Sequence, residues 1–137
     1  MRFNTIEHTA DTGIEVEAES LEDLFAGAAR AMFSIMVDLD GVEPVLARNI
    51  SLQASDLAEL MFRWLNELIF VVSADRLVLG DFEVRSVRDG RLEATVRGEE
   101  IDPARHSLEL EIKAATYHQM VVQERGEGWY ARVIFDV

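Results

Sequence analysis

Residues 20–36 read SLEDLFAGAARAMFSIM, and their apolar side chains recur with the period of an α-helix. Ser20 stands where a helix N-cap is expected, with the acidic Asp23 three residues later. We therefore predict an amphipathic helix that ends near Asp38, ahead of Pro44. Its apolar stripe consists of Leu21, Leu24, Phe25, Ala28, Ala29, Met32, Phe33 and Met36.

A second stretch with the same period follows at residues 55–72, where Ser55 is the predicted cap. We expect Glu59, Arg63 and Asn66 on its polar side. Because each helix carries one apolar stripe, both are expected to pack on one shared core. The second stripe consists of Leu57, Leu60, Met61, Trp64, Leu65, Leu68, Ile69 and Val72.

Most of the remaining sequence alternates apolar and polar residues, which predicts β-strands. We predict an α+β fold in which the two amphipathic helices pack on one side of a mostly antiparallel β-sheet. Asp89-Gly90 is typical of a tight hairpin turn, and residues 125–128 are predicted to form a second hairpin loop. The predicted strands are residues 2–8, 13–20, 81–88, 91–97, 107–114, 117–124 and 129–137, and residues 45–53 look extended.

Length and composition indicate one domain over residues 1–137, because typical domains have about 100–150 residues and no linker or repeat divides the chain. The net charge is −13, from 26 acidic and 13 basic residues. This balance argues against a broad nucleic-acid surface and against attachment to anionic membranes. It leaves metal ions, cationic ligands and a basic protein partner as candidates.

The absence of cysteine excludes disulfides, thiol catalysis and cysteine-bound zinc. The longest apolar run is residues 68–72, whereas a membrane-spanning helix needs about 20 apolar residues. The beginning of the chain, MRFNT, has no apolar signal core. These observations predict a cytoplasmic protein without a membrane partner.

A candidate site lies in HTADTG, residues 8–13, in the predicted turn between the first two strands. Asp11 of this turn and Asp136 near the end of the last strand are candidate carboxylate ligands. With the terminal carboxylate or a nearby main-chain carbonyl, they would form the oxygen-only donor set that Ca²⁺ or Mg²⁺ prefers. The alternatives are a structural Asx-turn at Asp11 and a solvated chain end at Asp136.

His8 lies three residues before Asp11 and is a candidate accessory residue of the same turn. Asp11-Thr12-Gly13 also matches the signature of aspartic proteases, in which two carboxylates share one proton. A homodimer could pair two copies of Asp11, but aspartic proteases are almost all-β and this sequence predicts two helices.

The remaining charged and histidine residues show no spacing typical of a site. His106 and His118 are expected to be structural, because neither lies at the spacing of a zinc motif. The segment GEEID at residues 98–102 and the pair Arg105-His106 are expected to form a solvated, charged turn.

The whole set of motifs resembles the archease family over residues 3–137. The resemblance rests on motifs that occur in this sequence in the same order as in the family. They are HTAD at 8–11 with Gly13, LEDLF at 21–25, WLNEL at 64–68, GE at 98–99, Asp102 and His106, KAATYH at 113–118, and VIFDV at 133–137. Thr12 departs from the Ile or Val expected in the family, which makes the protease triplet look accidental.

The resemblance implies a non-enzymatic accessory protein of the GTP-dependent RtcB-type tRNA-splicing RNA ligase. Such proteins promote guanylylation of the ligase, permit multiple turnovers and broaden its nucleotide use. Carried over to this sequence, the family's metal site consists of Asp11, Asp136 and Val137, with Ca²⁺ expected first and Mg²⁺ or Mn²⁺ as alternatives. RNA is then contacted at most through the ligase, and the oligomeric state is left open.

Two further functions stay open at this point. One is the dimeric aspartic hydrolase that would use Asp11. The other is a general chaperone or binding module, which the resemblance also implies, whose acidic strand face with Glu15, Glu17 and Glu19 would engage basic clients.

Overall fold

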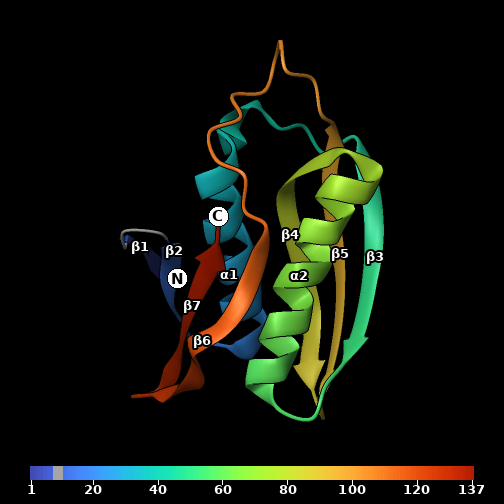
Figure 1. Ribbon diagram of the computed structural model, residues 1–137. Helices are drawn as coiled ribbons and strands as arrows, with labels where there is room; N and C mark the ends of the chain where they lie inside the picture. Colours follow the sequence, from blue (N-terminus) through green and yellow to red (C-terminus); the bar gives the residue numbers. More distant parts are fainter. Residues whose placement is uncertain (8–10) are drawn as a thin grey trace.

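The computed structural model describes residues 1–7 and 11–137, with side chains for residues 1–5 and 12–137. It shows helices packed against antiparallel sheets, so the α+β class is confirmed (Figure 1). The elements in chain order are β1 (Arg2–Glu7), β2 (Asp11–Ala18), α1 (Leu21–Met36), the 3₁₀ helix η1 (Leu39–Gly41), β3 (Leu46–Gln53), α2 (Leu57–Asp75), β4 (Leu77–Arg88), β5 (Arg91–Glu100), β6 (Ala114–Arg125) and β7 (Gly128–Asp136).

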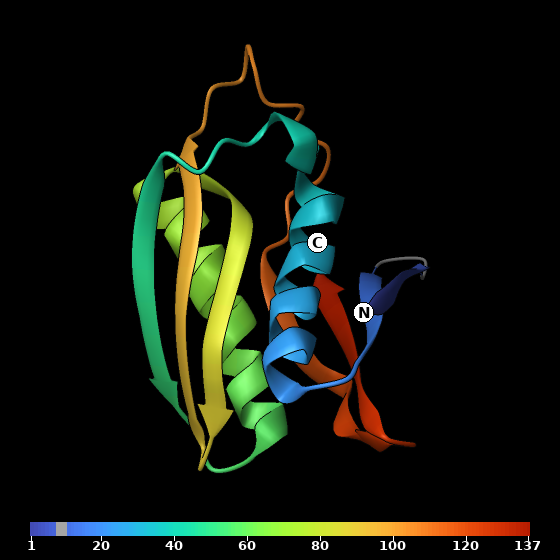
Figure 2. The same ribbon diagram turned by 180° about the vertical axis from the view of Figure 1, so that it is seen from behind.

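The strands divide between two sheets, where the sequence predicted one. One sheet has the order β1-β2-β7-β6 and the other has the order β3-β5-β4, with antiparallel neighbours throughout both. Helix α2 lies along the β3-β5-β4 sheet and also contacts β6 (Figure 1). Helix α1 contacts both β4 and β2 and therefore lies between the two sheets (Figure 2).

Residues 107–113, which the alternation predicted as part of a strand, lie in the connection between β5 of one sheet and β6 of the other. Among the described residues their only β-bridge joins Val37 and Leu108, where the segment runs beside the end of α1. Its last residue, Lys113, donates its N–H to Asp136 of β7. Ile112 is buried, but Leu108 and Leu110 are 53% and 41% exposed. The predicted strand is therefore wrong, and its leucines do not face the core.

The helix caps show how far local sequence determines the helix ends. The Ser20 hydroxyl accepts the N–H of Asp23 at 3.1 Å, which confirms the predicted N-cap. The cap of α2 is Asp56 rather than Ser55, because the Asp56 carboxylate accepts the N–H of Glu59 at 2.8 Å. A carboxylate and a hydroxyl are both good caps, so local sequence alone did not show which of Ser55 and Asp56 caps the helix.

The predicted turn at Asp89-Gly90 is confirmed between β4 and β5. Both residues have positive φ, 53° and 74°, as the tight turn of a twisted hairpin requires. The β6–β7 turn is shorter than predicted, because β6 ends at Arg125 and β7 begins at Gly128.

The core unites both helices with both sheets. Fully buried side chains include Phe25 and Phe33 of α1, Trp64 of α2 and Phe135 of β7. The Trp64 indole N–H donates to the main-chain oxygen of Phe25 at 2.9 Å, so the aromatic ring is buried with its polar atom satisfied. In the part of the chain that the structure describes, neither helix is long and apolar enough to cross a membrane.

Candidate functional site

Strands β2 and β7 bring the two predicted ligand positions together. In their antiparallel register, Asp11 lies directly opposite Asp136, and Gly13 lies opposite Ile134. On its other side Asp136 is opposite Ala114 of β6, and its main-chain oxygen accepts the N–H of Lys113 at 2.8 Å. The Asp136 backbone is thus held from both sides, and the residue itself is exposed.

Along the outward face of the same two strands, acids stand opposite or beside arginines. Glu15 lies opposite Arg132, with a carboxylate oxygen 3.8 Å from a guanidinium nitrogen, and it also accepts the Tyr130 hydroxyl at 3.3 Å. Glu17 pairs with both Arg2 and Arg125. The acidic row predicted to engage basic clients is therefore largely paired within the chain.

The charge pattern changes at the end of this face, where Asp136 stands opposite another aspartate. None of the ion pairs found among residues 1–7 and 11–137 involves Asp136. Like charges directly opposite each other destabilise a sheet unless something compensates them. The register therefore creates a local excess of negative charge at Asp11 and Asp136.

Gly13 allows β2 to approach β7 this closely. A Cβ atom at Gly13 would lie 2.6 Å from the main-chain oxygen of Val133 and 2.9 Å from the Cδ1 atom of Ile134. Both distances are far inside van der Waals contact, so only glycine fits without moving β7. Gly13 therefore helps to hold the register that places Asp11 opposite Asp136.

The donor set at this pair has the chemistry of a hard-cation site, since carboxylate and carbonyl oxygens are the ligands that Ca²⁺ and Mg²⁺ prefer. Val137 packs partly against the core, so its main chain rather than its side chain supplies any donor. The Asp11 side chain and the accessory candidate His8 lie outside the described residues. Among the described residues, no group of three or more histidine, aspartate or glutamate side chains is arranged to hold a metal.

Comparison with known proteins identifies the family of this chain. The model of the Archease protein family (MTH1598/TM1083) matches residues 3–137. This chain belongs to the archease family. The protein archease of Methanopyrus kandleri is 39% identical over 140 residues and covers 100% of both chains. That of Pyrococcus abyssi is 35% identical and covers 99% of both.

Solved structures agree with this fold for an archease. The solution structure of Methanobacterium thermoautotrophicum protein 1598 is 33% identical, covers 98% of each chain and has a TM-score of 0.85. The crystal structure of a Thermotoga maritima archease, described as a possible chaperone, has a TM-score of 0.70 at 23% identity and covers 100% of this chain and 98% of that one. The second likeness supports the fold alone.

The segment around Glu99 and His106 corrects a sequence-based expectation for this archease. A solvated turn was predicted, yet Glu99 is 8% exposed and His106 is 3% exposed. The Asp102 N–H donates to His106 Nδ1 at 2.8 Å, so Nδ1 is an acceptor and the ring proton is on Nε2. Nε2 lies 3.2 Å from a Glu99 carboxylate oxygen. The Glu43 N–H donates to the same carboxylate at 2.6 Å, and Arg105 pairs with it.

These contacts make the cluster structural. The Glu43 N–H, followed by His106 and Arg105, holds the pKa of Glu99 below its usual value, although burial acts in the opposite direction. The carboxylate thus ties the loop before β3 to the loop after β5. Sequence reasoning missed this role because Glu43, whose N–H the carboxylate accepts, lies far from Glu99 in the chain.

Asn66 is a second residue whose role local sequence did not reveal. It was expected on the polar side of α2, but its amide bonds both main-chain groups of Ala115 in β6, accepting the N–H at 2.9 Å and donating to the oxygen at 3.2 Å. Asn66 therefore joins the second helix to the sheet that carries Asp136.

An aromatic stack lies on the outside of the same contact. The rings of Phe62 and Tyr117 are stacked with centroids 4.1 Å apart and an interplanar angle of 13°. Partial burial raises the pKa of the Tyr117 hydroxyl, and the nearby carboxylates of Glu59 and Asp56 raise it further. His118, the next residue, is exposed.

Proposed function

We propose that this archease is a non-enzymatic accessory protein that activates the GTP-dependent RtcB-type tRNA-splicing RNA ligase in the cytoplasm. In this role it promotes guanylylation of the ligase, allows multiple turnovers and broadens nucleotide use. The proposal is supported by membership of the family over nearly the whole chain and by the motifs at residues 8–11 and 133–137 that carry the resemblance.

We also propose that Asp11, Asp136 and Val137 hold a divalent cation, with Ca²⁺ as the first candidate and Mg²⁺ or Mn²⁺ as alternatives. The observation that carries this proposal is the register that sets Asp11 opposite Asp136. Residues directly opposite in an antiparallel pair have Cβ atoms about 5 Å apart, a spacing that one cation can bridge through carboxylate oxygens. The bound ion supplies compensating positive charge at the end of the β2–β7 pair.

The chain's own residues then act through shape and charge. Gly13 lets β2 lie close against β7, and the Lys113 N–H, which donates to the main-chain oxygen of Asp136, holds the end of β7 from the other side. The backbones of the acidic pair are therefore positioned before any partner arrives. A nucleotide-dependent ligase has a cationic active site, which an acidic strand end can approach. By binding the nucleotide-competent conformation better than others, the archease shifts the ligase toward that conformation.

The deciding experiment is a ligation assay with the cognate ligase. It measures turnovers per ligase molecule with and without this protein, across nucleotides and divalent metals. Asp11→Ala and Asp136→Ala are compared with Asp40→Ala, which removes an exposed carboxylate at the 3₁₀ helix η1. We expect multiple turnover with the wild type and Asp40→Ala but not with the two site variants. Full activation by folded Asp11→Ala would contradict the role of the acidic pair.

A chaperone role is the second candidate, because the Thermotoga maritima relative is described as a possible chaperone. It predicts that the protein suppresses aggregation of unrelated clients and that this activity survives Asp11→Ala. The helices α1 and α2 disfavour the third function, a dimeric aspartic hydrolase, because such enzymes are almost all-β.

A further inference from the structure

Residues 107–113, which we name the strap, run beside the end of α1, and around Leu108 one edge of the backbone is free. The Asp38 N–H donates to the oxygen of Ser107 at 3.2 Å, and the Glu109 N–H donates to the oxygen of Met36 at 2.9 Å. In an extended chain the N–H and C=O groups of successive residues point to opposite sides. The N–H and C=O groups of Leu108 therefore point away from α1, and neither they nor those of Leu110 have a hydrogen bond within residues 1–7 and 11–137.

The strap also exposes apolar and acidic side chains in alternation. Leu108 and Leu110 are 53% and 41% exposed, and Glu109 and Glu111 alternate with them. An extended segment with a free edge and exposed leucines is a template for another strand. Proteins use such edges for β-addition, in which main-chain hydrogen bonds provide affinity and pockets for alternate side chains provide specificity.

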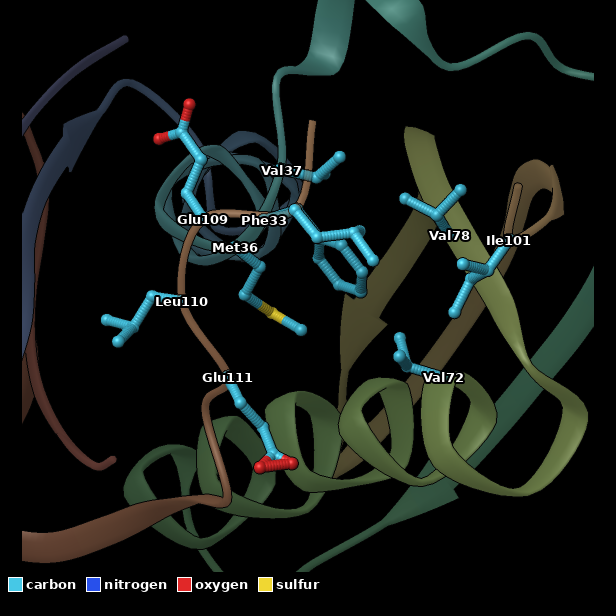
Figure 3. Close-up of a pocket in the computed structure, with 10 residues that line it drawn as sticks. Phe33, Met36, Val37, Val72, Val78, Ile101, Glu109, Leu110 and Glu111 are labelled. Carbon is cyan, nitrogen blue, oxygen red and sulfur yellow. The ribbon is translucent and has the colours of Figure 1, made fainter. Parts of the chain in front are cut away.

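A pocket for such a side chain lies beside the strap. It has a volume of about 350 Å³ and is lined mainly by apolar residues from separate elements. Figure 3 shows Phe33 and Met36 on one side facing Val72 and Ile101 on the other, with the strap along its border. This volume is within the range of pockets that bind small apolar groups.

The two carboxylates of the strap make the border of this pocket acidic. Glu109 and Glu111 are exposed, and neither forms an ion pair with a side chain in the described part of the chain. Figure 3 shows the two carboxylates at opposite ends of this border, on either side of Leu110. Their natural complement is a segment with more than one lysine or arginine.

We propose that the strap is a docking edge for an extended, basic segment of another protein. The backbone of that segment pairs with Leu108 and Leu110, an apolar side chain enters the pocket beside Phe33 and Met36, and its cations pair with Glu109 and Glu111. The net charge of −13 favours the encounter, because it attracts basic partners over long distances. A second copy of this chain is a poor occupant, since an antiparallel strap would place acids opposite acids.

The test uses a short, capped peptide of alternating lysine and valine as the probe, with no ligase present. A negative ligation result therefore leaves this proposal standing. Titration followed by amide chemical shifts and by calorimetry is expected to move the signals of residues 107–113 and those of Phe33, Met36 and Val72. The same peptide with its alternate amides N-methylated keeps every charge and loses main-chain donors. We expect this peptide to bind at least ten-fold more weakly, because it loses roughly two main-chain hydrogen bonds to the strap.

Paired protein variants separate specific docking from general attraction. The double variant Glu109→Gln/Glu111→Gln is compared with Glu124→Gln/Glu127→Gln, which removes the same charge from exposed positions around the β6–β7 turn. We expect Glu109→Gln/Glu111→Gln to bind the peptide about five-fold more weakly, which corresponds to the loss of two exposed ion pairs. We expect Glu124→Gln/Glu127→Gln to bind it as the wild type does.

Each alternative outcome overturns the proposal. Equal losses in both double variants would reduce the interaction to net charge, and equal binding of the N-methylated peptide would exclude β-addition. Sedimentation of the chain alone tests the other possible occupant of the strap, a second copy of this chain. A concentration-dependent dimer that Leu110→Ser abolishes would assign the strap to a second copy of this chain.

Discussion

Asp11 and Asp136 lie directly opposite each other in the antiparallel pair of β2 and β7. They stand beyond Glu15 and Arg132, which pair across the same two strands with opposite charges. Two acids at one end of an otherwise charge-paired strand face have a stability cost that a bound cation would remove.

Asp136→Asn should abolish stabilisation of the fold by Ca²⁺. A ligand at 100 times its dissociation constant stabilises the native state by about 2.7 kcal/mol, so the wild-type unfolding temperature should rise on addition of Ca²⁺ and fall with chelator. Without metal, Asp136→Asn should be slightly more stable than the wild type, by about 0.2–1 kcal/mol, because a like-charge pair is gone. Thermal unfolding with Ca²⁺ and with chelator measures both effects, and Asp40→Asn is the control. Ca²⁺ stabilisation of Asp136→Asn equal to that of the wild type would argue against the site.

Gly13→Ala should destabilise the protein, because the added methyl group would lie 2.6 Å from the main-chain oxygen of Val133. Overpacking of this kind costs about 1–3 kcal/mol. Gly41→Ala is the matched control, since the nearest atom to its Cβ is the main-chain oxygen of Arg105 at 3.8 Å. Urea unfolding compares the two variants, and equal stabilities would show that β2 and β7 have room to separate.

Glu99→Gln should reduce the loss of stability that the protein shows in acid. Because the pKa of Glu99 is lowered in the folded protein, chiefly by the Glu43 N–H, its contribution is present above the unfolded value of about 4.3. That contribution disappears as the pH falls through the folded pKa. The free energy of unfolding measured from neutral to acidic pH tests this, with the exposed neighbour Glu100→Gln as control. Identical pH profiles for wild type and Glu99→Gln would contradict the prediction.

Asn66→Leu should destabilise the contact between α2 and β6. Leucine has similar size but leaves the N–H and C=O of Ala115 without their side-chain partner, at a cost of about 1–3 kcal/mol for each buried polar group. Arg63→Leu, on the exposed side of the same helix, should change stability by less than about 1 kcal/mol. Denaturant unfolding of both variants checks the difference, and similar losses would show that the amide is replaceable.

Phe62→Ala should lower the pKa of Tyr117 toward that of a free tyrosine. The raised pKa has burial as its main cause, and Phe62 covers one face of the ring. Ultraviolet titration in a Tyr130→Phe background isolates this hydroxyl, because the chain has two tyrosines. Glu59→Gln should also lower the pKa by removing a repelling charge. A pKa unchanged in both variants would contradict the assigned causes.

The sequence predicted those features that depend on neighbours along the chain. Helix α1 and its Ser20 cap follow from a local period and a local hydrogen bond, and the Asp89-Gly90 turn follows from residues that tolerate positive φ. The strand predicted over the strap is wrong, because alternation of apolar and polar residues does not show whether another strand lies alongside. Its backbone bonds the end of α1, and its leucines stay partly in solvent.

At the candidate site, too, some features follow from the sequence and others from the tertiary structure. The residue types at positions 11 and 136 and the family resemblance determined which acids to consider and the class of cation that would suit them. Only the tertiary structure decided that Asp11 and Asp136 are direct cross-strand neighbours and that Glu99 and His106 are buried partners. Strand register and burial depend on which distant segments meet, and that choice is made by packing of the whole core rather than by local sequence.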